Sequence, residues 1–193
     1  MSHVLRVDLT EKTVKSEPLP EGWLERFIGG KGLAAAYLLK HLPPGAEALG
    51  PENLLLFAWG PLVGLAPGAT RICVATRSPQ TGAFVDSYAG GYFPSALRHA
   101  LPDHLAVVVA GRAQTPLYLE VDGGRAALRD AAALWGKDVR QTCEALEPFK
   151  VACIGPAGEN GVSFATVSSD HATHHAGRGG CGATGARAVS RVR

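Results

Sequence analysis

The chain has 193 residues, of which 46% are hydrophobic and 19% charged, and a formal net charge of +2. This composition supplies enough apolar material for a folded core. Basic residues are scattered rather than gathered in a stripe, so nucleic acid is not an expected partner. The apolar runs at 54–59 and 105–110 are too short to cross a bilayer, and the N-terminus lacks the apolar region of a secretory signal. We therefore expect a cytoplasmic protein without a membrane partner.

The first half of the sequence predicts an initial hairpin followed by strands and helices in mixed order. Apolar and polar residues alternate on both sides of the turn Thr10-Glu11-Lys12. Glycine and proline pairs punctuate the later segments and end the predicted helices. The predicted strands are 3–9, 13–17, 54–59, 71–76 and 83–87, and the predicted helices are 21–28, 33–41 and 92–101.

The second half continues in the same style. Asp122-Gly123-Gly124 between two alternating runs is typical of a hairpin turn. Strict alternation of strand and helix is absent, and most connections have the length of hairpins, so we expect an α+β fold of mostly antiparallel sheets rather than a doubly wound nucleotide fold. We find no internal repeat at the level of residues. The predicted strands are 104–110, 117–121, 125–129, 150–154, 162–168 and 188–192, and the predicted helix is 137–146.

The cysteines predict free thiols. Four are present, far apart and without a C-x-x-C spacing, and the absence of a secretory signal favours a reducing compartment. Cys73 and Cys153 lie in apolar strand patterns, where cysteine usually packs as a small hydrophobe. An iron–sulfur cluster needs four convergent thiolates, and this chain carries no motif for one.

Glycine-rich segments are the most informative local feature, because the chain has 24 glycines. Residues 29–32 precede a predicted helix, where backbone N–H groups and Lys31 could hold an anion, although such a pattern is more often a plain helix stop and restart. In residues 86–93, small residues would let a flat ligand lie against the backbone, but a simple strand-to-helix turn is the favoured interpretation. In residues 176–183, four glycines around Arg178 form a backbone nest with a bidentate phosphate donor, and here we favour function.

Histidines precede the last of these segments in the pattern H-x-x-H-H, at His171, His174 and His175. Loop histidines without a nearby carboxylate or thiolate pair are weak evidence for a metal site, so we favour polar loop residues near an anion and keep a metal site as the alternative. The sequence offers no Ser–His–Asp arrangement and no close pair of carboxylates. We therefore predict no catalytic residue in this chain.

Taken in order, these segments resemble the N-terminal domain of the tungsten aldehyde:ferredoxin oxidoreductase family. The resemblance implies that residues 1–193 form a single pterin-cofactor-binding domain, with two six-stranded, mostly antiparallel sheets in a pseudo-twofold relation and a few short helices. It runs from about Leu5 to the C-terminus and is carried by GGKGLAAAYLL, LGPENLLLFAWGPLVGLAPGATR, ATRSPQTG, AGGYF, GRAQTPLYL, LRDAAALWGKD, IGPAGEN and AGRGGCGA.

The resemblance also implies a cofactor. In this family the domain binds two molybdopterin dithiolenes that chelate tungsten or, by the same chemistry, molybdenum, and a magnesium ion bridges their phosphates. Arg71 matches an arginine that links the pterin to the cluster region, Gly90 a backbone contact, and Lys31 a basic position beside the pterin. The implied cofactor-binding residues are Lys31, Arg71, Tyr88, Ala89, Gly90, His174, His175, Ala176, Gly177 and Arg178.

Three of these residues depart from the family pattern. Tyr88 stands in place of an asparagine associated with magnesium and phosphate, His174 in place of a pterin-binding arginine, and His175 in place of a small residue. Replacing arginine by histidine loses a permanent bidentate charge. A carbonyl ligand to magnesium is still available at Tyr88 or His175, since every residue carries one.

The expected function is that of a tungsten- or molybdenum-pterin-binding domain or subunit of an aldehyde:ferredoxin oxidoreductase-like enzyme, which oxidises an aldehyde to a carboxylic acid and passes the electrons to ferredoxin. The chain ends at Arg193, before the family's iron–sulfur and substrate domains, so we expect it to be inactive alone and to need a separately encoded subunit. This chain would interact with ferredoxin only indirectly, through that subunit. The alternative is a non-catalytic, homo-oligomeric binding or carrier module that has lost the cofactor.

Overall fold

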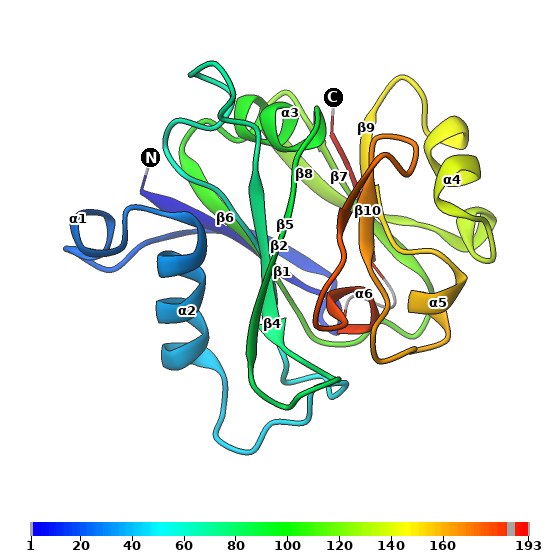
Figure 1. Cartoon of the computed structure of the whole chain (residues 1–193), viewed down its shortest axis with the longest axis horizontal. Coiled ribbons are helices and arrows are strands. Elements are labelled where there is room, and N and C mark those ends of the chain that lie inside the picture. Colours follow the sequence, from blue (N-terminus) through cyan, green and yellow to red (C-terminus); the bar gives the residue numbers. More distant parts are fainter. Residues whose placement is uncertain (1, 185–187, 193) are drawn as a thin grey trace.

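The computed structural model describes residues 2–184 and 188–192, and its first half forms one sheet (Figure 1). Its helices precede β3 and follow β5, as the sequence predicts. The strands are β1 (His3–Asp8), β2 (Thr13–Pro18), β3 (Leu55–Ala58), β4 (Ile72–Arg77), β5 (Phe84–Ala89) and β6 (His104–Ala110), and the helices are α1 (Trp23–Phe27), α2 (Gly30–His41) and α3 (Phe93–Ala100).

The second half forms a second sheet with shorter helices. Asp138 begins the longest of them with a capping box, in which its carboxylate accepts the Gln141 backbone N–H and the Gln141 side chain accepts the Asp138 N–H. The strands are β7 (Leu117–Asp122), β8 (Arg125–Asp130), β9 (Lys150–Cys153), β10 (Val167–Ser169), β11 (His174–Ala176) and β12 (Ala188–Val192), and the helices are η1 (Ala132–Leu134), α4 (Val139–Ala145), α5 (Pro156–Glu159) and α6 (Cys181–Thr184).

The two sheets have the same topology. The first has the order β2-β1-β6-β3-β4-β5, and the second, taken from its other edge, has the order β8-β7-β12-β9-β10-β11. Each half begins with an antiparallel hairpin whose first strand pairs in parallel with the last strand of the half, β1 with β6 and β7 with β12. The α+β fold with two mostly antiparallel, pseudo-twofold-related sheets is therefore confirmed.

The repeat leaves short traces in the sequence at equivalent positions. A Gly-Pro pair follows the equivalent strands β3 and β9 at the same spacing, as Gly60-Pro61 and Gly155-Pro156. The flanking residues differ, which is why no repeat is visible at the level of residues.

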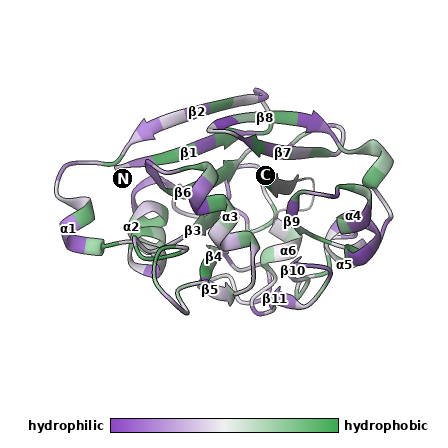
Figure 2. Cartoon of the chain, turned by 90° about the horizontal axis from the view of Figure 1, so that it is seen from above, coloured by the Kyte–Doolittle hydropathy of each residue, from purple (hydrophilic) through white to green (hydrophobic). Residues whose placement is uncertain are grey.

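The two halves exchange their crossover helices. The sheets meet at both edges, where β2 lies beside β8 and β5 beside β11 (Figure 2). α3 belongs to the first half but packs against β7, β9 and β12, while α6 belongs to the second half and packs against β4. One hydrophobic core consequently contains residues of both halves, including Trp59, Leu97 and Val121.

The central strands of the first sheet are apolar because both of their faces are covered. β3 is buried throughout, and β4 and β6 are buried at all but one residue each. α2 packs against these strands, on the side of the first sheet that faces away from the second (Figure 1). The other face contributes to the core shared with the second half.

Most predicted elements are present, but two predictions in the second half are wrong. The strand expected at 162–168 is confined to β10, because Ala165 N–H bonds to the Val162 carbonyl in a turn. The histidine segment, expected to be a loop, contains β11. α2 also begins three residues earlier than expected, at Gly30, whose N–H bonds to the Trp59 carbonyl.

The expectations about membrane-spanning helices and about cysteines can be compared with the described residues. None of the helices in residues 2–184 and 188–192 is long and apolar enough to span a membrane. All four cysteines are buried free thiols, as predicted. Burial raises the pKa of Cys73 and of Cys181 to about 12 each, so these thiols stay protonated.

A pair of leucine substitutions tests the shared core. Leu97 of α3 is 1% exposed and Leu39 of α2 is 87% exposed. Leu97→Ala should lower the free energy of unfolding by about 2–5 kcal/mol through the cavity it leaves, whereas Leu39→Ala should change it by less than about 0.5 kcal/mol. Urea unfolding followed by circular dichroism measures both. A Leu97→Ala protein that unfolds in two steps, losing one half first, would contradict the shared core.

Candidate functional site

The two glycine-rich segments come together where β5 and β11 meet. β5 ends at Ala89 and β11 at Ala176, and the residues opposite them across the neighbouring strands are Ile72 and Val167. This register makes the two strand ends equivalent. We call residues 90–92 loop 1 and residues 177–180 loop 2; loop 1 leads into α3 and loop 2 into α6.

Loop 2 is held by side chains of the first half. The Ser87 hydroxyl accepts the backbone N–H of Arg178 at 3.1 Å, and the Ser78 hydroxyl donates to the Gly179 carbonyl at 2.8 Å. Ser78 is fully buried and also accepts two backbone N–H groups from its own turn. Loop 2 therefore rests on a hydroxyl whose position is fixed.

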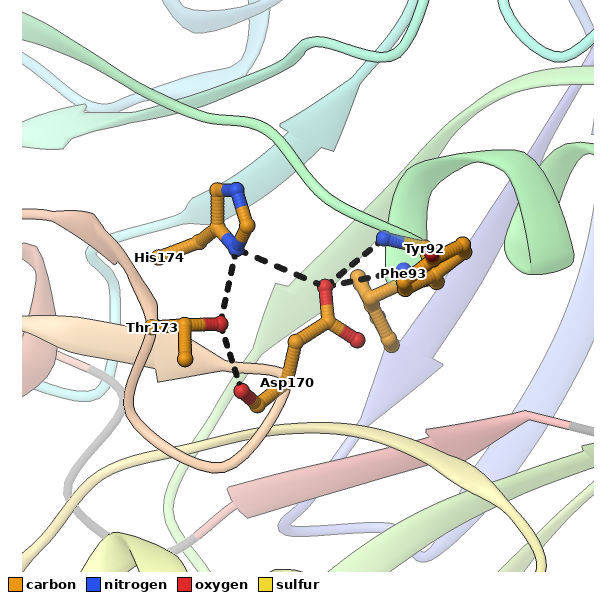
Figure 3. Close-up of polar contacts among 5 residues, drawn as sticks. All are labelled: Tyr92, Phe93, Asp170, Thr173 and His174. Carbon is orange, nitrogen blue, oxygen red and sulfur yellow. Dashed lines mark hydrogen bonds and ion pairs between the residues drawn. The ribbon is translucent and has the colours of Figure 1, made fainter.

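Loop 1 is held in the same way by the second half (Figure 3). One carboxylate oxygen of Asp170 accepts the backbone N–H of Tyr92 at 2.7 Å and, more weakly, that of Phe93 at 3.5 Å. Nδ1 of His174 lies 3.0 Å from the Thr173 hydroxyl and 3.8 Å from the same Asp170 oxygen. Each loop is thus completed by the half to which it does not belong.

Glycine is required where the halves approach most closely. Gly91 has φ +90°, and a Cβ there would overlap the Asp170 carboxylate and lie 2.8 Å from Nδ1 of His174. Gly179 and Gly180 have φ +73° and +76°, and a Cβ at either would collide with the first half or with Ser163. Gly90 differs, since a Cβ there would make only an ordinary 3.4 Å contact with His174. The glycines permit both the left-handed backbone and the short separation.

Three basic side chains were predicted at the site, and one of them is already paired. Lys31 Nζ lies 3.2 Å from the Asp86 carboxylate, so its charge is partly neutralised. Arg71 stands just before β4, at the same end of the β4–β5 hairpin as Gly90, and is exposed. The Arg178 side chain is also exposed. Neither guanidinium has a hydrogen-bond or ion-pair partner in the part of the chain that the structure describes.

The remaining predicted residues lie on the strands that lead into the loops. Ala89 and Ala176 are buried and offer only backbone groups. Tyr88 and His175 precede them at equivalent positions. Partial burial, with smaller contributions from Cys73 and Asp86, raises the pKa of Tyr88, so its phenol is neutral. Nδ1 of His175 lies 2.8 Å from the Ser168 hydroxyl.

The three histidines do not converge on one point. His171 faces Glu147 at 3.8 Å, His174 faces Asp170 and Thr173, and His175 faces Ser168. Within residues 2–184 and 188–192, no cluster of three or more histidine, cysteine, aspartate or glutamate side chains could hold a metal ion. The geometry of the described residues gives the alternative metal site no support.

Three residues that hold the loops were not among the predicted site residues. Asp170, Ser78 and Ser87 each lie in or just after a strand of the half opposite the loop they contact. Their role depends on the topological repeat, which the sequence does not display. The only local signal was the short spacing from Asp170 to His174.

Alanine at the two glycines of loop 1 tests this close approach. Gly91→Ala should lower the free energy of unfolding by about 2 kcal/mol or more, because it adds a left-handed non-glycine residue and displaces Asp170. Gly90→Ala should change it by less than about 0.5 kcal/mol. Urea titration of both variants measures the difference. Equal stability of the two proteins would show that Asp170 does not approach Gly91 as described.

Comparison with known proteins identifies the family. Residues 4–189 match the family model described as aldehyde ferredoxin oxidoreductase, N-terminal domain. The tungsten-containing aldehyde ferredoxin oxidoreductases of Pyrococcus abyssi and Thermococcus kodakarensis are 41% identical over 187 residues and 42% identical over 186 residues, respectively. Each alignment covers 93% of this chain and 30% of the relative. A Pyrococcus furiosus protein named aliphatic sulfonate oxidoreductase, WOR-like subunit, is 34% identical over 201 residues.

A solved structure shares the fold over the whole chain. It is the active site complex BamBC of benzoyl coenzyme A reductase with 1,5-dienoyl-CoA, and it matches with a TM-score of 0.94 and 34% identity, covering 100% of this chain and 30% of the other. The chain thus spans about 30% of the length of the relatives that it matches. By sequence and by fold, the chain belongs to the aldehyde ferredoxin oxidoreductase N-terminal domain family.

Proposed function

We propose that loops 1 and 2 together bind a pterin cofactor carrying tungsten or molybdenum, as part of an aldehyde ferredoxin oxidoreductase-like enzyme. The observation that carries the proposal is the convergence of two equivalent glycine loops beside two exposed arginines. Each loop ends a strand and begins a helix, so its backbone groups face the junction of the two halves. Such an arrangement offers two related surfaces to a ligand made of two related parts.

The residues at the junction fit a flat, anionic ligand. Beside Gly177, nothing lies nearer than 4.0 Å to the place of a Cβ, so a planar group could lie against the backbone there. Beside Gly90, the His174 ring lies 3.4 Å from that place. Arg71 and Arg178 supply guanidinium groups suited to bidentate binding of phosphate or carbonyl oxygens. The carbonyls of Tyr88 and His175, which occupy equivalent positions, would be available to hold a magnesium ion.

The protein's own contribution would be binding and orientation. When bound, the metal–dithiolene group would supply the two-electron redox chemistry. Backbone groups of both loops would fix the rings, and Arg71 and Arg178 would neutralise the phosphates. No acid–base residue of this chain takes part in the proposal.

We further propose that the face beside loop 1 docks the cluster-bearing and substrate-binding part of the enzyme, supplied by a separate subunit. The segment 28–31 is tied to the segment after β3 by the bond from Gly30 N–H to the Trp59 carbonyl, and Gly64 packs against α3. Exposed apolar groups on adjoining segments are typical of interaction surfaces. This apolar rim consists of Ile28, Leu62, Leu65 and Tyr92, which are 63%, 62%, 62% and 72% exposed.

A second candidate function has its own supporting observation. The position beside Gly90 holds the imidazole of His174, accompanied by the carboxylate of Asp170, and this pair attracts anions less than a free guanidinium does. A non-catalytic module that self-associates through the apolar rim would tolerate such a change. Light scattering of the purified protein distinguishes this homo-oligomer from a monomer awaiting its partner subunit.

Cofactor content tests the leading proposal. Protein expressed with tungstate or molybdate in a host that makes molybdopterin should contain metal and organic phosphate. Arg71→Ala and Arg178→Ala should each reduce that content by about 10-fold or more, since a charge-assisted hydrogen bond contributes about 1.5–3 kcal/mol. Metal analysis by mass spectrometry and phosphate analysis measure both.

Arg125→Ala is the matched control, because Arg125 is exposed on β8, at the opposite edge of its sheet from β11. It should leave the cofactor content unchanged. Wild-type protein without metal or organic phosphate would contradict the proposal and favour the non-catalytic module.

A further inference from the structure

We infer that Asp170 is the positioning residue of loop 1, and that its carboxylate directs the anionic group of a ligand to loop 2. The inference rests on the proposed function in one respect, that the two loops form the ligand site. It goes further because it distinguishes the two pseudo-equivalent loops: loop 2 accepts the anionic group of a ligand, and loop 1 does not.

Asp170 already occupies the anion position of loop 1. The first N–H groups of a helix point outward and attract negative charge. In α3, Pro94 lacks such a group, and the Asp170 carboxylate takes those of Tyr92 and Phe93 (Figure 3). An incoming phosphate would therefore meet a bound carboxylate rather than free donors.

The carboxylate is held in place by its own turn. Its side chain is 9% exposed, and its backbone carbonyl accepts the Thr173 hydroxyl at 2.6 Å and the Thr173 N–H at 3.2 Å. Asp170, His171 and Ala172 all have positive φ, between 50° and 63°. Three successive non-glycine residues in this conformation are strained, and such strain persists only where the surrounding structure enforces it.

The equivalent contacts at loop 2 are neutral. Ser78 follows β4 as Asp170 follows β10, and it reaches Gly179, the residue equivalent to Tyr92. The Ser87 hydroxyl accepts the Arg178 N–H. Loop 2 is thus fixed by hydroxyl groups and keeps its exposed guanidinium. Loop 1 is fixed by a carboxylate, with the His174 imidazole beside it, the Lys150 ammonium 5.3 Å from the centre of the Tyr92 ring, and Arg71 at the same end of the β4–β5 hairpin.

Amide exchange in the cofactor-free protein tests the positioning role without reference to any ligand. Residue-resolved NMR should show the amides of Tyr92 and Phe93 exchanging at least 10-fold faster in Asp170→Ala than in the wild type. Asp170→Asn should keep their protection, because its carbonyl oxygen still accepts the same N–H groups. Ser87→Ala is the matched control and should affect only the Arg178 amide. Unchanged exchange at Tyr92 and Phe93 in Asp170→Ala would overturn the inference.

Titration with inorganic pyrophosphate tests whether the Asp170 carboxylate keeps anions away from loop 1. In the wild type, pyrophosphate should shift the amides of residues 177–180 and leave those of residues 91–93 in place. In Asp170→Ala it should also bind at residues 91–93 and restore the lost protection. If Asp170→Ala does not fold, Asp170→Gly replaces it, because glycine tolerates the positive φ at this position and also leaves the Tyr92 and Phe93 N–H groups free.

Two results would count against the charge selection. Pyrophosphate shifts at residues 91–93 of the wild type would overturn it directly. The absence of shifts at both loops in every variant would overturn it together with the proposed anion site, while the exchange experiment would still decide the positioning role. A failure of the inference alone, with pyrophosphate bound at both loops of the wild type, leaves the proposed function standing.

Discussion

The close approach of each glycine loop to side chains of the other half, where β5 meets β11, is the constraint on which the rest of the structure depends. At Gly91, Gly179 and Gly180 the other half or a neighbouring segment lies so near that any side chain would have to displace it. The same approach lets Asp170 reach Tyr92 and Ser78 reach Gly179. Neither loop is complete within its own half, so the site exists only when both halves are folded together.

The exchanged helices explain how this contact is maintained. α3 and α6 begin directly after the loops and pack on the opposite half's sheet. The core that stabilises the fold therefore also holds each loop against the other half. Burial of α3 residues such as Leu97 and Phe93 thereby positions backbone groups that make no apolar contact themselves. Stability and ligand binding are linked through the same two helices.

Much of the fold could be predicted from the sequence, because its long elements have strong local signals. The hairpins around residues 10–12 and 122–124 combine alternation with turn residues, and β6 is a continuous apolar run. β10 and β11 have three residues each, which is too short for a periodic pattern. Their pairing is set by the repeat of topology rather than by their own residues.

The candidate site was predictable in part for the same reason. Arg71, Gly90 and Arg178 lie in glycine-rich segments that the family resemblance also marks, and the structure brings them to one junction. Asp170 was missed because its partner Tyr92 is 78 residues away in sequence. Lys31 was predicted as a basic residue that could hold an anion, but its pairing with Asp86, 55 positions away, depends on how α2 packs against β4, the neighbour of β5. Contacts between distant residues such as these cannot be predicted from a short stretch of sequence.

The location of the metal tests the central claim most directly. Anomalous X-ray scattering from crystals of protein loaded with tungsten or molybdenum locates that atom independently of any assumption about the ligand. The account predicts a single metal at the junction of loops 1 and 2, within reach of both arginines. A metal bound elsewhere, for example beside His171 and Glu147, would contradict it.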